Sequence, residues 1–322
     1  MIQNLEDAVV RAIARCDGDV EELEELADRT PEALTPYLPR LLAADVVYPA
    51  KLYRAADSET QRGLVAKADA GGIGGLRLNH LLMALAQTRG PVVEAAFRRW
   101  RDQPPLDADK LCIGPAEYMR EGGWMLEGDR VRELCGPVSY ELRAEEDEAV
   151  RGGVGVDPTG RLCQGCGGPM WTALDLDSAD ERVAEALAHV GWSGRLRVAI
   201  CYECNVHRDT EFIEVGTDGT CRLSDPPEPG AIVSGPEVED DDELPAVRWR
   251  LGRRTGLHPS GSALGGRPVW TGDATYPECP VCGTLMTYIA QVDMENISYV
   301  PMYFTFFLHT ECGLAAMVSQ GE

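Results

Sequence analysis

The sequence predicts a multidomain α+β protein with an N-terminal all-α helical-hairpin array and a mostly β, internally duplicated second domain with zinc-ribbon-like knuckles. Three observations lead to this prediction. The first hundred residues have helical periodicity. Near Leu106 this periodicity fades and the Pro and Gly content rises, and the second part carries cysteine pairs separated by two residues. The predicted domains are residues 1–105 and residues 106–322.

The N-terminal domain reads as successive amphipathic helices separated by short gaps that contain Gly, Pro or Asp. We expect helices at about residues 4–16, 19–28, 31–43, 47–55, 58–69, 75–88 and 90–101. This succession resembles a HEAT-like repeat, in which helical hairpins stack and leave a concave binding surface. A plain helical bundle is the alternative, because the sequence contains no crisp repeated motif.

The second domain contains short runs rich in β-branched and aromatic residues, which predict strands. The expected strands are residues 138–142, 170–176, 196–201, 211–215, 247–251, 285–292 and 302–308, with one helix at about 178–191. A Pro-, Gly- and acid-rich loop at 224–246 joins two halves, about 106–223 and 247–322.

Eight residues in this domain have the spacing of zinc ligands, because two side chains separated by two residues can reach one ion from a tight turn. Four cysteines would form one site and three cysteines with one histidine the other, and these eight metal ligands are Cys163, Cys166, Cys201, Cys204, Cys279, Cys282, His309 and Cys312. Each site is a closed shell of four protein ligands, which predicts two structural Zn²⁺ ions. His207 could replace one cysteine of the first site.

Other interpretations of the cysteines remain open at this stage. A CxxC pair can be a thioredoxin-like redox motif, or its members can be ordinary buried cysteines. The remaining cysteines lack a spaced partner and are interpreted as small buried hydrophobic residues: Cys16, Cys112, Cys135 and Cys221.

Residues 163–177 and 279–293 align without a gap. The match includes both cysteines and the following glycine, as well as Met170 with Met286 and Asp177 with Asp293. We interpret this similarity between the two segments as an internal duplication.

The net charge is −23, from 53 acidic and 30 basic residues. Such a balance disfavours a nucleic-acid partner, which requires a positive footprint, and favours a basic protein as partner. Solubility alone is the alternative explanation of the charge. The acidic run Glu237–Glu243 is either a docking site or simply a solvated loop.

The stretch LGGRPVW at 264–270 and the knuckle and strand at 276–293 resemble the YwqG-like family of bacterial proteins. They are also similar to the C-terminal region of programmed cell death protein 2. The resemblance covers mainly residues 255–320 and implies a mostly β, duplicated fold without an established enzymatic activity. It also implies a chaperone-like role toward a basic ribosomal protein, or an immunity role against toxins. The helical region lies outside it, and zinc ligands are not universal in the YwqG-like family.

We therefore expect a non-catalytic, zinc-stabilised protein-binding protein. Two alternatives are a nucleic-acid-binding zinc ribbon, favoured by Arg248, Arg250, Arg253 and Arg254, and an enzyme of unrecognised class. The sequence contains no GxSxG, HExxH or Walker-type motif. The sequence shows neither a secretory signal nor an apolar run of about 18 residues, which predicts a cytoplasmic protein that does not associate with membranes. The sequence leaves the oligomeric state open.

Overall fold

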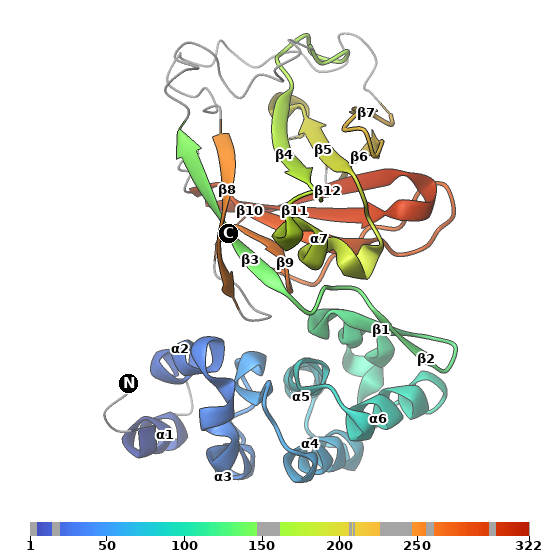
Figure 1. The fold of residues 1–322 in the computed structure, drawn as a ribbon. Helices are drawn as coiled ribbons and strands as arrows, with labels where there is room; N and C mark the ends of the chain where they lie inside the picture. The colour runs from blue at the N-terminus through green and yellow to red at the C-terminus, as the bar shows by residue number, and fades with distance from the viewer. Residues whose placement is uncertain are drawn as a thin grey trace. The chain divides into compact units, whose positions relative to one another are not determined.

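The computed structural model describes residues 5–14, 20–146, 162–205, 208, 210–225, 247–255, 261–295 and 301–321. The chain divides into two compact units, Met1–Leu134 and Cys135–Glu322 (Figure 1). The first is helical and the second is built on a large antiparallel sheet, so the predicted α+β multidomain class is confirmed. Two expected features, His207 and the acidic run 237–243, lie outside the described residues. Within the described parts of the chain, no helix combines the length and apolar character needed to cross a membrane.

The first unit gathers around one helix, α5. Its α-helices are α1 (Leu5–Ala14), α2 (Glu21–Arg29), α3 (Leu38–Ala43), α4 (Ser58–Ala70), α5 (Gly75–Thr88) and α6 (Pro91–Asp102). Its 3-10 helices are η1 (Pro31–Tyr37), η2 (Ala50–Tyr53), η3 (Ala108–Lys110) and η4 (Pro115–Gly122). Helix α5 contacts η2, η3, η4, α4 and α6, and it is buried on several sides. Because contacts surround it, α5 needs apolar residues on more than one face.

Residues 106–134 pack with the helices, although we expected them in the β-rich domain. They form η3, η4 and a hairpin of β1 (Trp124–Glu127) and β2 (Arg130–Glu133). The Trp124 ring is fully buried against Phe97 at 5.6 Å, and its indole N–H donates to the Ala86 carbonyl at 3.0 Å. The rise in Pro and Gly near Leu106 therefore marks a change of local structure within the first unit, and the boundary between the units follows Leu134.

The second unit contains an eight-stranded sheet in the order β7-β6-β12-β11-β10-β9-β3-β8. Its strands are β3 (Ser139–Glu146), β6 (Thr210–Val215), β7 (Cys221–Leu223), β8 (Val247–Thr255), β9 (Ala263–Gly265), β10 (Thr287–Asp293), β11 (Met302–His309) and β12 (Leu314–Gly321). Strand β3 lies between β8 and β9, and β6 pairs with β12. Strands from the two expected halves are therefore mixed within one sheet, with β6 and β7 on one side of β9–β12 and β3 on the other.

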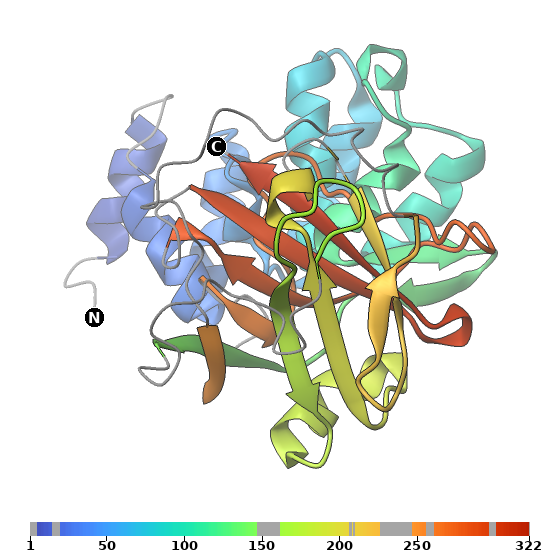
Figure 2. The same ribbon diagram turned by 90° about the horizontal axis from the view of Figure 1, so that it is seen from above.

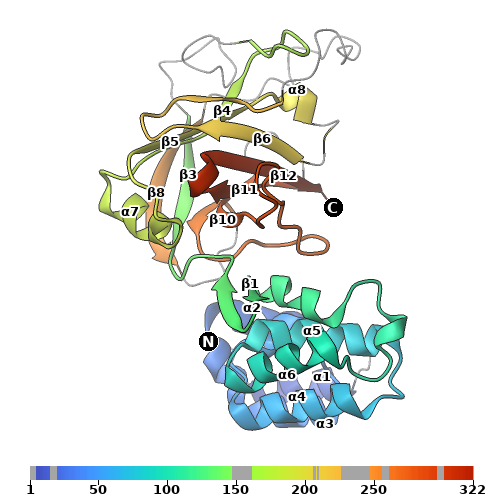
Figure 3. The same ribbon diagram turned by 90° about the vertical axis from the view of Figure 1, so that its right-hand side faces the viewer.

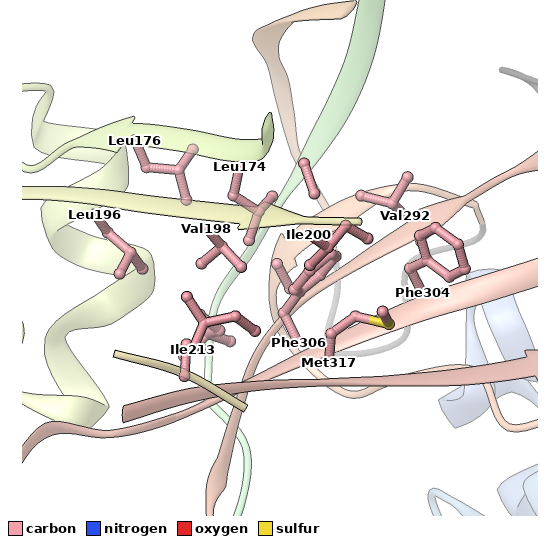
Figure 4. Packing of buried hydrophobic residues seen from close by; sticks show 14 of the residues in the cluster. Leu174, Leu176, Leu196, Val198, Ile200, Ile213, Val292, Phe304, Phe306 and Met317 are labelled. Carbon is pink, nitrogen blue, oxygen red and sulfur yellow. The ribbon is translucent and has the colours of Figure 1, made fainter. Parts of the chain in front are cut away.

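A second, two-stranded sheet covers one face of the large sheet. It consists of β4 (Trp171–Asp177) and β5 (Arg195–Ile200), linked by α7 (Glu181–Leu187) and the 3-10 helix η6 (Ala188–Val190). Figures 2 and 3 show this layer against strands β10 to β12. Figure 4 shows their contact, with Leu174 and Val198 above Phe306 and Met317 and with Phe304 to one side of them. These apolar side chains form the core of the unit.

On strand β10, the side chain of Gln291 hydrogen-bonds to the backbone of Val269, which lies outside the strands. Its side-chain amide is 1% exposed and donates to the Val269 carbonyl at 2.8 Å, while its carbonyl accepts from the Val269 N–H at 2.9 Å. The adjoining Trp270 ring lies over Phe307, with centroids 6.3 Å apart, so Trp270 acts in packing. Part of the stretch LGGRPVW at 264–270 thus has a structural explanation.

Gly265 occupies a position that a side chain would disturb. Its φ is +75°, and a Cβ placed there would lie 2.3 Å from the Val138 carbonyl oxygen. The backbone at this position therefore approaches Val138 too closely for a side chain.

We predict that Gly265→Ala lowers the free energy of unfolding of the second unit by about 1–3 kcal/mol, because it adds left-handed strain and a backbone clash. Gly272→Ala is the matched control, since a Cβ placed there would meet no atom of the described residues within 4 Å. Urea denaturation of both variants measures the difference, and equal midpoints would contradict the prediction.

Candidate metal centres

The first group of predicted ligands lies at the open end of the β4–β5 hairpin. Cys163 and Cys166 precede β4, and Cys201 and Cys204 follow β5. The antiparallel register pairs Trp171 with Ile200, which brings the start of one strand beside the end of the other. The two cysteine pairs meet there because of this register.

The second group has the same arrangement on β10 and β11. Cys279 and Cys282 precede β10. His309 is the last residue of β11, and Cys312 follows that strand. Thr287 pairs with Leu308, so the two ligand pairs again meet at the open end of a hairpin. The structure thus assembles all eight predicted ligands into two groups of four.

The distances within the groups fit a tetrahedral metal ion. The Sγ atoms of Cys163 and Cys204 are 3.5 Å apart, as are those of Cys166 and Cys201. In a tetrahedron with metal–sulfur bonds of about 2.3 Å, neighbouring sulfurs are roughly 3.8 Å apart. A disulfide would require about 2.05 Å, so these pairs are not bonded. All ligand atoms of a group lie within 4.8 Å of one another.

The second group contains a nitrogen ligand. Both ring nitrogens of His309 lie 3.9 Å from the Cys282 Sγ. This distance is close to the edge of a mixed sulfur and nitrogen tetrahedron, roughly 3.6 Å for bonds of about 2.3 and 2.05 Å. Either nitrogen can therefore face an ion held by the three thiolates.

Each group begins in the same kind of turn. Cys163 N–H donates to the Gly168 carbonyl, and the Gly167 N–H donates back to the Cys163 carbonyl at 2.9 Å. Gly165 and Gly168 N–H groups also point at the Cys163 and Cys166 sulfurs, both at 3.3 Å. Backbone donors of this kind stabilise thiolates.

The backbone of the second turn repeats that of the first, 116 positions later. Cys279 N–H donates to the Thr284 carbonyl, and Gly283 has a φ of +73° where Gly167 has +76°. The strands also share a register shift, after Thr172 in β4 and after Tyr288 in β10. The similarity that the sequence shows therefore extends to local structure.

The matched aspartates at the strand ends have the same role. Asp177 accepts from the Ala179 N–H at 2.9 Å, and Asp293 accepts from the Glu295 N–H at 3.1 Å. In both cases the carboxylate binds the backbone two residues later and starts the turn that ends the strand.

Without a cation, the thiols of the first group do not ionise together. Burial opposes ionisation of Cys163, but N–H donors from Cys166 and Gly165 outweigh it and hold its pKa below the usual value. Burial raises the pKa of Cys201 far above that value and the pKa of Cys204 to about 12. One thiolate per group is favoured until a positive ion compensates the others.

The second group shows the same division. The hydroxyl and N–H of Thr284 lower the pKa of Cys282, whereas desolvation and then the neighbouring cysteines raise the pKa of Cys312 to about 11. Thr284 stands where the first group has Gly168, so its hydroxyl is an additional donor. Sequence reasoning overlooked Thr284, although it follows the knuckle glycine directly.

The two groups differ in exposure. In the first, Cys163, Cys201 and Cys204 are buried and Cys166 is half-buried. In the second, only Cys279 is buried, His309 and Cys312 are half-buried, and Cys282 is exposed. The second group therefore lies closer to solvent.

The remaining cysteines follow the sequence interpretation only in part. Cys221 and Cys135 are buried, and the Cys135 Sγ lies 3.1 Å from the Tyr276 hydroxyl. Cys112 is exposed, so the prediction of burial was wrong for it, because it lies in a surface bend between η3 and η4. Cys16 lies outside the described residues.

A buried carboxylate near the first group was also overlooked. Glu211 on β6 is 1% exposed, on the face of the strand that carries Ile213 and Val215. Burial raises its pKa to about 7, against the effects of Arg208 and of the Cys201 N–H. The alternation of β6 could have revealed it, since Glu211 occupies a core-facing position.

Comparisons with known proteins find a bacterial relative. The uncharacterized protein YpfL of Salmonella typhimurium (strain LT2) is 31% identical over 229 residues, which is 67% of this chain. The match covers 52% of that protein, so the chain spans about half the length of the relative. No family model and no solved structure matches the chain.

We predict that metal binding releases protons and strengthens as pH rises. The Cys204 and Cys312 thiols have raised pKa values of about 12 and about 11, so both are protonated at neutral pH before a metal displaces their protons. Calorimetric titration of metal-free protein in buffers of different ionisation enthalpy measures the released protons. Equal heats in all buffers, or an affinity independent of pH between about 6 and 8, would contradict the prediction.

Proposed function

We propose that this protein binds a basic polypeptide without catalysing a reaction, and that two structural zinc ions stabilise its β-rich unit. The observation that carries the proposal is the pair of four-ligand groups at the open ends of two hairpins. Three properties support it: the identity of the metal, the type of site and the charge of the chain.

Zinc fits the ligand sets best. Thiolate and imidazole ligands select soft or borderline ions, and tetrahedral sets of four cysteines, or of three cysteines and one histidine, are typical of zinc. The ligand spacing on two turns is that of zinc ribbons.

The sites favour a structural role. A catalytic zinc keeps a coordination position for water, whereas each group here offers four protein ligands. Each ion would join the two strands of a hairpin at the end that no turn closes. The proposed function is therefore binding and not catalysis.

The charge supports a basic partner. Acidic residues exceed basic ones by 23 in the whole chain, and this field attracts cationic surfaces. The resemblance of residues 255–320 to the YwqG-like family and to programmed cell death protein 2 supports the same class, as a chaperone or as an immunity protein. The relative from Salmonella bears no functional name and supports only a bacterial relationship.

The arginines of β8 give little support to nucleic-acid binding. Arg254 donates to Glu185 at 2.9 Å, and Arg253 lies 4.0 Å from Glu141. Because carboxylates of the same unit face these guanidinium groups, they are partly neutralised before a phosphate could approach.

We predict two zinc ions per chain in protein purified without added metal. Native mass spectrometry counts the ions. Cys201→Ala and Cys279→Ala, one in each group, should each reduce the count by one, whereas Cys112→Ala, outside both groups, should leave two. A count of zero in the parent protein with free thiols would refute the zinc proposal.

We also predict salt-sensitive binding of a basic peptide. A labelled peptide of about 20 residues, rich in Lys and Arg, should bind at about 50 mM salt and lose most of its affinity at about 300 mM, because salt screens exposed charges beyond a few ångströms. Fluorescence anisotropy measures both affinities, and an acidic peptide of equal length is the control. Equal binding of both peptides would contradict a charge-selective partner site.

A further inference from the structure

The second metal centre is open to solvent at one ligand. Cys282 is exposed, whereas Cys166, which occupies the equivalent position in the first centre, is half-buried. The residue before Cys282 is Val281, whose side chain is 72% exposed at the tip of the same turn. The ligand turn of the second centre therefore projects into solvent.

A surface hollow adjoins another ligand of the same centre. It has a volume of ≈ 690 Å³ and is lined by Val281, Cys312 and Gly313 on one side and by Glu214 and Arg222 on the other. A reagent of the size of peroxide or maleimide can enter a space of this volume. Two of the three thiolates of the second centre are thus accessible from outside, while three of the four in the first are buried.

We propose that the second centre is a thiol-modification site, attacked first at Cys282 by peroxides and soft electrophiles, and that this attack releases its metal while the first centre keeps its own. The proposal rests on the two zinc ions of the proposed function. Exposure decides the order of reaction, because both centres present the same type of nucleophile and differ in solvent access.

Hydrogen peroxide would oxidise the second centre in two steps. The Cys282 thiolate attacks one peroxide oxygen, which forms a sulfenic acid and releases hydroxide. The thiolate of Cys279 or Cys312 then attacks the Cys282 sulfur, forms a disulfide and releases the second hydroxide. Two thiolates are oxidised, both peroxide oxygens are reduced, and the centre loses two anionic ligands, so the metal leaves. All ligand atoms lie within 4.8 Å, so either thiolate can reach Cys282.

The test uses the zinc-loaded full chain with Cys112→Ser, which removes an exposed thiol outside the centres. Peroxide is added in steps while a chromogenic chelator reports free zinc, and mass spectrometry of peptides locates each disulfide. We expect one zinc per chain to leave first, together with a disulfide that contains Cys282, while the first four cysteines remain reduced. Simultaneous release of both ions, or first oxidation at Cys163, Cys166, Cys201 or Cys204, would overturn the proposal.

A second measurement does not depend on a variant of either centre. With a limiting amount of N-ethylmaleimide, Cys282 should be labelled at least about ten times faster than Cys166, because thiolate reactivity follows access. Equal labelling rates would also overturn the proposal. The zinc count before any reagent separates the two hypotheses: fewer than two ions refutes the proposed function, whereas two ions with the wrong order of reaction refutes this inference alone.

Discussion

The antiparallel register of two hairpins is the constraint on which the β-rich unit depends. Pairing Trp171 with Ile200 and Thr287 with Leu308 places two ligand turns side by side at each open end. A slip of one residue would turn every side chain of a strand to the opposite face, so the ligands and the core would be lost together. A metal ion held by these groups would therefore select the same register as the packing of the core.

The two hairpins do not contribute equally to the core. β10 and β11 lie in the middle of the large sheet, whereas β4 and β5 cover one of its faces and bury Phe304 and Phe306 (Figure 4). A metal ion in the first group would thus stabilise the layer that closes the core, and three of the four ligands of that group are buried. The second lies at the ends of two central strands, which are already held by neighbouring strands, and this is consistent with its greater exposure.

Much of this organisation could be predicted from the sequence, because it depends on short spacings. The ligand pairs and the α5 boundaries at residues 75–88 are both local features. Strand β12 was not predicted, since its Ala-rich start has weak β propensity and gains its place from β6 and β11. The mixing of strands from both halves in one sheet also depends on long-range pairing, which no local pattern encodes. For residues 106–134, local composition suggested the wrong unit, because the packing of η4 against α5 and α6 is not a local feature of the sequence.

The pairing of strands from both halves in the large sheet affects the order in which the parts of the unit can fold. Glu214 of β6 pairs with Leu314 of β12, and β3 pairs with β9, so completing the sheet on both sides of β10–β12 requires contacts between segments far apart in sequence. The first metal group needs only local closure, with ligand pairs separated by 35 and 41 residues. Because short loops close at a lower entropic cost, the first ligand group could close around a metal ion before the long-range pairs form. During synthesis on the ribosome, the ion would then stabilise the β4–β5 layer before the large sheet has formed.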